Sequence, residues 1–221
     1  MKDDATAAAH GAPLWRRLAV GPGAALLVAA DVATLGFITL GFEMVASRIL
    51  TPLFGSGIYT WATIISIVVA GLMAGYFIGG LVADRHPTFG VAALIKFIAA
   101  VYLLFVFVIT AGGLGRIIDA VPGEIAALFA SGIIVCFPPM LVLGMYSPLS
   151  VRMVLGDPHD AGKVSGGLFA ISSLGNIIGI IVTTFVLIPS IGTRAITLGF
   201  AAFLIISSMS SVVVRVSRAQ S

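Results

Sequence analysis

Residues 58–82 read IYTWATIISIVVAGLMAGYFIGGLV and contain no Asp, Glu, Lys or Arg. The hydrocarbon core of a bilayer is crossed by a helix of about 20 apolar residues. This run is long enough to cross, and it lacks the alternation of polar and apolar residues that a barrel strand requires. The stretch therefore predicts a transmembrane helix.

Five further apolar runs of similar length follow the same pattern, at about 25–48, 90–112, 124–147, 164–188 and 194–214. They predict an all-α integral membrane protein with six transmembrane helices, like half of a major facilitator transporter. The short links favour one domain over residues 23–215, between tails at 1–22 and 216–221. Pro138 and Pro139 predict a kink or break in the fourth run, because an internal proline removes a helical hydrogen bond.

Composition supports this class and excludes others. Of the 221 residues, 59% are hydrophobic and 10% are charged, whereas soluble domains carry about 25% charged residues. The net charge of +3 is too small to favour nucleic acid as a partner. The single cysteine, Cys136, excludes an internal disulfide and a cysteine-built metal site, and its apolar surroundings predict a buried thiol.

The basic residues predict an orientation in the cytoplasmic (inner) membrane, with both termini cytoplasmic. A cytoplasmic N-terminus satisfies the positive-inside rule. It places inside Lys2, Arg16, Arg17, Arg85, Arg152, Lys163, Arg215 and Arg218, and outside only Arg48, Arg116 and Arg194. Lys96 lies within the third run and is expected to extend its ammonium group to the inner surface. The Arg16-Arg17 pair resembles the start of a signal peptide, but the apolar run continues to Glu43, which favours a retained first helix.

Small residues recur in the second and fifth runs, the middle members of two triplets. Spacing of four residues between small side chains allows close helix packing in lipid. These positions are Gly71, Gly75, Gly79 and Gly80 in the second run, and Ser165, Gly166, Gly167, Ser172, Ser173, Gly175 and Gly179 in the fifth. Each run ends in a turn closed by arginine, GGLVADR at 79–85 and LIPSIGTR at 187–194. This similarity between the second and fifth runs predicts an inverted three-plus-three repeat, an arrangement found in many transporters.

Polar side chains inside apolar runs are candidates for a substrate site, because they are costly in lipid unless satisfied. We select Glu43, Arg48, Asp31, Tyr59, Trp61 and Asn176. For each an alternative stays open. Glu43 can be a hydrogen-bonded anchor within the bundle, Arg48 and Asp31 can reach the headgroups, and Asn176 can join helices. Tyr59 and Trp61 suit an interfacial aromatic belt.

Two longer patterns carry a family resemblance. GGLVADR resembles the loop motif of major facilitator transporters, in which Asp84 would accept from backbone amides and Arg85 would pair with a neighbouring helix end. The stretch FEMVASRILTPLFGSGIYTW at 42–61, with MYSPLSVRMV at 145–154 and GKVSGGLFAISSLGNIIGIIVTTFVLIPSIGTR at 162–194, resembles membrane-bound spermidine synthase-like proteins, also described as fused major facilitator/spermidine synthase proteins. These blocks span about half of the chain.

The resemblance implies the membrane module of that family without its soluble aminopropyltransferase domain. AGGLGR at 111–116 lacks the strand–loop–helix context of a nucleotide site, so we expect neither enzyme activity nor a cofactor. DPHD at 157–160 predicts a solvated turn rather than a metal site. Two functions stay open. One is a carrier of a small cationic substrate such as a polyamine, completed by a homodimer. The other is an anchor that holds a separate soluble enzyme through the loops at 84–90 and 150–163.

Overall fold

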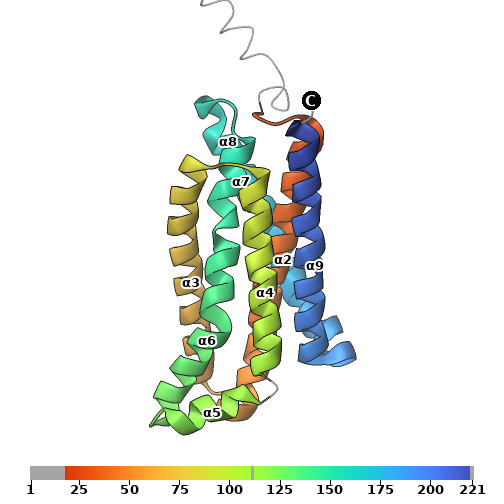
Figure 1. Cartoon of the computed structure of the whole chain (residues 1–221). Coiled ribbons are helices and arrows are strands. Elements are labelled where there is room, and N and C mark those ends of the chain that lie inside the picture. Colours follow the sequence, from red (N-terminus) through yellow and green to blue (C-terminus); the bar gives the residue numbers. More distant parts are fainter. Residues whose placement is uncertain (1–17, 111, 220–221) are drawn as a thin grey trace, which may run out of the picture.

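The computed structural model describes residues 18–110 and 112–219, and within these ranges every regular element is a helix (Figure 1). The first three are α2 (Pro22–Phe54), α3 (Ile58–Arg85) and α4 (Phe89–Ile109). The short α5 (Gly113–Ala120) leads to α6 (Glu124–Gly144) and α7 (Tyr146–Val154). The last elements are η2 (Pro158–Asp160), α8 (Ala161–Val182), η3 (Thr183–Leu187) and α9 (Ile188–Ala219).

Five stretches in the described residues are long and apolar enough to cross a membrane: Pro22–Phe54, Ile58–Arg85, Phe89–Ile109, Glu124–Val154 and Pro158–Val216. This confirms the all-α membrane class. The last stretch has 59 residues, about three times the length that a bilayer core requires. Its backbone leaves helical geometry at Gly192, where φ is 76° and ψ is 163°. Figure 1 shows the chain reversing where η3 passes into α9.

The long helices form one bundle in three closely packed pairs, α2 with α8, α3 with α6, and α4 with α9. The link between α3 and α4, the link after α7, and the C-terminal end of α9 lie at one end of the bundle (Figure 1). The link between α2 and α3 lies with α5 at the opposite end. α5 contacts α4 and α6 and closes part of that end.

Glycines allow two of these pairs to approach closely. On α3, a Cβ at Gly71, Gly75 or Gly79 would collide with the backbone of α6 or with Met145, which follows it. On α8, a Cβ at Gly175 or Gly179 would collide with the backbone of α2. The glycines of α3 thus lie at its contact with α6, and those of α8 lie at its contact with α2.

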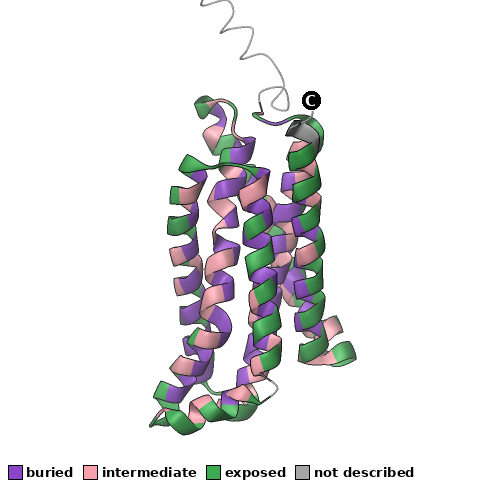
Figure 2. Cartoon of the chain, viewed as in Figure 1, coloured by how far each residue is buried: buried purple, intermediate pink, exposed green. Residues whose placement is uncertain are grey.

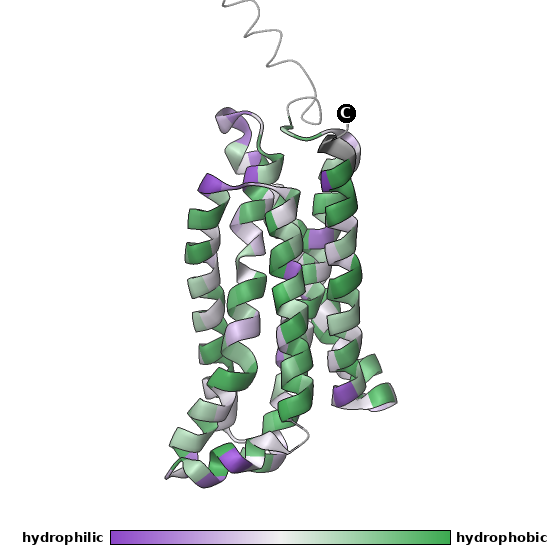
Figure 3. Cartoon of the chain, viewed as in Figure 1, coloured by the Kyte–Doolittle hydropathy of each residue, from purple (hydrophilic) through white to green (hydrophobic). Residues whose placement is uncertain are grey.

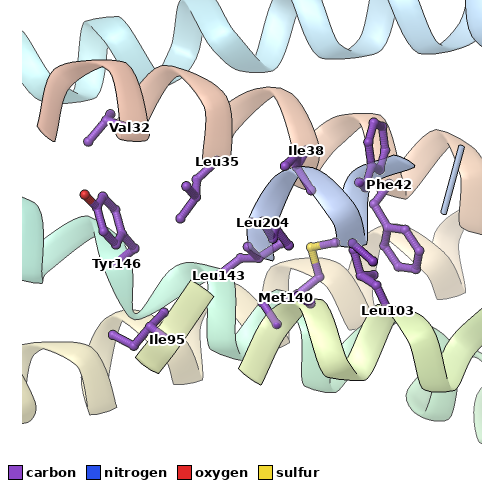
Figure 4. Packing of buried hydrophobic residues seen from close by; sticks show 14 of the residues in the cluster. Val32, Leu35, Ile38, Phe42, Ile95, Leu103, Met140, Leu143, Tyr146 and Leu204 are labelled. Carbon is purple, nitrogen blue, oxygen red and sulfur yellow. The ribbon is translucent and has the colours of Figure 1, made fainter. Parts of the chain in front are cut away.

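The bundle is apolar both inside and outside. Inside, aliphatic and aromatic side chains from α2, α4, α6 and α9 interlock, including Phe42, Leu103, Met140 and Leu204 (Figure 4). Outside, exposed positions follow the outer helix faces (Figure 2), and most of them are hydrophobic (Figure 3). Phe77 and Phe185 are 70% and 74% exposed. A surface of this kind is stable against lipid tails and unstable in water.

Three local predictions need correction. α2 does not end at about residue 48 but continues through Pro52 to Phe54, where Gly55 ends it with a φ of 77°. α6 runs through Pro138 and Pro139, and the helical hydrogen bonding is interrupted further on, at Met145, whose dihedral angles (φ −58°, ψ −26°) remain helical. Pro138 cannot donate to the carbonyl of Ile134, and the Tyr102 hydroxyl on α4 donates to that carbonyl instead, at 2.7 Å. The third correction concerns the link between the runs at 90–112 and 124–147, which contains a further short helix, α5, from Gly113 to Ala120.

Candidate functional site: a polar cavity beside a buried ion pair

A cavity of about 470 Å³ lies between α2, α3, the α6–α7 junction and α8. Leu72 and Tyr76 of α3 form one wall. The other walls carry a set of hydroxyl and amide side chains that is unusual for the interior of a membrane bundle: Thr39, Tyr146, Ser147, Ser150, Ser172, Ser173 and Asn176. Polar groups at membrane depth commonly mark a substrate or ion pathway. This cavity is therefore the candidate functional site.

Several lining groups are already satisfied within their own helices. Thr39 donates to the carbonyl of Leu35 at 2.7 Å, and Ser150 donates to that of Ser147 at 2.7 Å. Asn176 differs, because its Oδ1 atom is buried and has no hydrogen-bond partner in the described residues. A buried acceptor without a donor costs free energy. Asn176 is thus the predicted site residue that the structure places in the cavity wall.

Directly behind the cavity wall, Asp31 of α2 forms a buried ion pair with Lys96 of α4. The Nζ atom of Lys96 lies 2.7 Å from Oδ2 of Asp31. Lys96 also donates to the carbonyl oxygen and the hydroxyl of Ser207, at 2.7 and 3.0 Å, and to the Ser211 hydroxyl at 2.7 Å. The hydroxyl of Ser207 donates to Oδ1 of Asp31 at 2.6 Å. The ion pair therefore joins α2, α4 and α9.

Lys96 does not extend its ammonium group to the inner surface, so that expectation is wrong. Its side chain is 0% exposed, and Asp31 is 8% exposed. Burial of a lone ammonium group is very costly, but a carboxylate and several oxygens at hydrogen-bond distance offset the loss of water. Asp31 likewise does not reach the headgroups, because its carboxylate is bound inside the bundle.

Tyr146 connects the ion pair to the cavity. It is the first residue of α7, is 2% exposed and contributes to the cavity wall. Its hydroxyl donates to Oδ2 of Asp31 at 3.0 Å. The centre of its ring lies 5.8 Å from Nζ of Lys96, within the range of a cation–π contact. Tyr146 therefore borders the cavity while its hydroxyl and ring contact the charged pair.

Glu43 lies beyond the cavity lining on the same face of α2. It follows Thr39 by four residues and Leu40 by three, and residues at these spacings share a helix face. The Cα atom of Glu43 stands about 6 Å further along the helix axis than that of Thr39. Glu43 is half-buried, and no ion pair or hydrogen bond joins it to another described residue.

The other three predicted substrate residues lie away from the cavity. Arg48 is exposed near the end of α2, Tyr59 is 73% exposed, and Trp61 is 37% exposed in the first turn of α3. None of the three lines the cavity. Their exposure at the end of the bundle suits an interfacial position. The structure thus places Asn176 in the cavity wall, Asp31 behind that wall and Glu43 beyond the lining, and it leaves these three outside the site.

The loop predictions have mixed outcomes. Asp84 does not cap the next helix, because Thr88 does so by accepting from the backbone N–H of Val91 at 3.3 Å. Asp84 instead faces Arg152 at 3.9 Å, and Arg85 forms no ion pair with the other described residues. Asp157 caps the turn η2. The described residues contain no cluster of three His, Cys, Asp or Glu side chains that could hold a metal ion.

Comparison with protein-family models, with curated proteins and with solved structures gives no match for this chain. The resemblance to spermidine synthase-like membrane proteins therefore stays a prediction.

Sequence reasoning missed Lys96 and Tyr146 as parts of the site. A lysine in the middle of an apolar run signals a buried partner, because lipid offers none. Asp31 was the carboxylate available to pair with Lys96, because both residues lie at a similar distance from the same end of the bundle. Tyr146 follows the glycine at 144 and precedes Pro148, which marks a helix interruption.

Proposed function

We propose that this protein is a membrane module that binds and carries a small cationic solute, with polyamines as the substrate class suggested by the family resemblance. The observation that carries the proposal is the polar cavity between α2, α3, α7 and α8. A purely structural bundle gains nothing from hydroxyl groups gathered around a cavity, whereas a solute with several polar groups requires them.

Two features favour a cation over an anion. The described lining contains no charged side chain, but it presents the aromatic rings of Tyr76 and Tyr146, which attract cations. Glu43 adds an unpaired carboxylate about one helical turn beyond Thr39. An elongated amine would place one ammonium group near Glu43 and the rest of its length among the hydroxyls.

The proposed topology has six crossings in an inverted three-plus-three repeat. If Gly192 separates two crossings, the first triplet is α2, α3 and α4, and the second is α6–α7, α8 and α9. A repeat makes α2 equivalent to α6, α3 to α8 and α4 to α9. Under this correspondence the pair α2–α8 becomes the pair α6–α3, and the pair α4–α9 becomes itself. The three observed helix pairs thus map onto each other, which supports a repeat.

The proposed orientation has both termini in the cytoplasm of a cell whose inner membrane holds the protein. Arg85, Arg152, Lys163 and Arg215 lie in or beside elements at one end of the bundle, and Arg48, Arg116 and Arg194 belong to elements at the other. This asymmetry follows the positive-inside rule. We also propose a homodimer, since six helices would form half of a pathway.

Uptake into proteoliposomes tests the proposal. Labelled putrescine and spermidine are offered to the wild type, to Glu43→Gln, and to Glu124→Gln as a control in which the same change falls on an exposed residue. We expect saturable uptake that Glu43→Gln lowers at least tenfold and Glu124→Gln leaves unchanged. Absence of uptake by folded wild-type protein refutes the carrier and favours an anchor, which pull-down of a soluble partner enzyme would then examine.

A further inference from the structure

Tyr146 stands at a weak point in the backbone. It directly follows Met145, the residue between α6 and α7. Pro148, the third residue of α7, has no N–H to donate to the carbonyl of Gly144 four residues earlier. The junction therefore has fewer backbone hydrogen bonds than a continuous helix, and it forms part of the cavity wall through Gly144, Tyr146 and Ser147.

One side-chain hydrogen bond compensates at this point. The Tyr146 hydroxyl donates to Asp31 Oδ2 at 3.0 Å and so ties the first turn of α7 to α2. Asp31 cannot easily move, because Lys96 and Ser207 hold the same carboxylate. The fixed ion pair is thus an anchor point, and the tyrosine is the link between it and the movable segment.

We infer that Tyr146 is a positioning residue that sets how open the cavity is, because its bond to Asp31 holds α7 against α2 across the interrupted α6–α7 helix. This rests on the proposed function, since it describes access to the same cavity. When the bond breaks, α7 tilts at Met145 and water and solute reach the cavity wall at Ser150. When the bond forms, Ser150 is enclosed, as it is in this structure, where it is 1% exposed.

A labelling experiment without any substrate tests this inference. Ser150→Cys places a thiol in the cavity wall, and Cys136→Ala removes the native thiol, which is buried. The labelling rate by a water-soluble thiol reagent then reports opening of the cavity. Tyr146→Phe keeps the ring and deletes only the hydroxyl. We expect labelling to accelerate about 2- to 10-fold, the population shift that loss of one hydrogen bond produces.

The matched control is Tyr102→Phe. That tyrosine also donates to an acceptor of another helix, the carbonyl of Ile134, but it lies outside the cavity lining. Both variants lose one hydroxyl bond and should lower the unfolding temperature similarly. Only Tyr146→Phe should accelerate labelling. Equal labelling rates in the wild type and Tyr146→Phe, or equal acceleration in both tyrosine variants, would overturn the inference.

A second variant covers the case in which Tyr146→Phe fails to fold. Asp31→Leu with Lys96→Leu removes the acceptor of the Tyr146 hydroxyl without leaving a buried charge. It should accelerate labelling in the same range, and an unchanged rate would again overturn the inference. Because labelling needs no substrate, failure of uptake would refute the carrier proposal alone, and failure of accelerated labelling would refute the role of Tyr146 alone.

Discussion

Removal of either partner of the Asp31–Lys96 pair should destabilise the protein more than removal of both. Lys96→Met deletes the cation and leaves a carboxylate that is 8% exposed, to which, among the described residues, only the hydroxyls of Ser207 and Tyr146 then donate. Loss of one partner of a buried ion pair costs about 3–5 kcal/mol. Asp31→Leu should cost a similar amount, because it leaves a fully buried ammonium group.

The double variant, Asp31→Leu with Lys96→Met, leaves no buried charge from this pair. Its remaining cost comes mainly from the Tyr146 hydroxyl, which loses its acceptor, at about 1–3 kcal/mol. Ser207 and Ser211 can donate to carbonyls of their own helix. We therefore expect the double variant to cost less than either single variant, and the two effects to be strongly non-additive.

The assay is unfolding in mixed micelles titrated with a denaturing detergent, followed by circular dichroism. Arg152→Met is the control, because that arginine lies 3.9 Å from Asp84 and both side chains are exposed, 53% and 77%. An exposed pair contributes about 1 kcal/mol or less. Single variants that each cost less than about 1 kcal/mol, or a double variant equal to the sum of the singles, would refute the view that this pair is a coupled, desolvated unit.

Glycine substitutions test the helix packing and the backbone reversal. Gly75→Ala should cost about 2 kcal/mol or more, because its Cβ meets the carbonyl oxygen of Leu141. By contrast, Gly167→Ala, with no atom within 4 Å of its Cβ, should be neutral or stabilise by up to about 1 kcal/mol in the same unfolding assay. Gly192→Ala should lower the free energy of unfolding by about 1–2 kcal/mol, because φ is 76° there. Gly199→Ala on the same helix should leave that free energy unchanged. Equal losses of stability in the two variants would contradict the strained geometry.

The sequence predicts the helices well, because twenty consecutive apolar residues leave few alternatives in lipid. The predicted helix boundaries were less accurate where a proline or a charged residue suggests that a helix ends. α2 carries Pro52 in its last turn and Arg48 in the turn before, since a proline near a helix end disrupts little and an arginine there can reach the headgroups. The amphipathic α5 was missed because its glycines at 112, 113 and 115 favour a loop on local grounds.

The site was less predictable than the fold. Asp31 and Lys96 are 65 positions apart, and Lys96 and Ser211 are 115 positions apart. No spacing rule connects residues on different helices, so their contact depends on the packing of α2, α4 and α9. Asn176 was identified from its depth alone, whereas the role of Tyr146 required knowledge of which helix interruption faces α2. The cavity itself arises between four elements and has no signature in any one of them.

The most direct test of the account is whether the polar cavity is the path of the solute. Ser173 is exposed in the cavity wall on α8, and Ile177, one turn further, is 54% exposed and does not line it. Uptake of labelled spermidine into proteoliposomes should be abolished by Ser173→Phe, which fills the cavity, and preserved by Ile177→Phe. Full uptake by a folded Ser173→Phe variant would contradict the assignment of this cavity as the solute site.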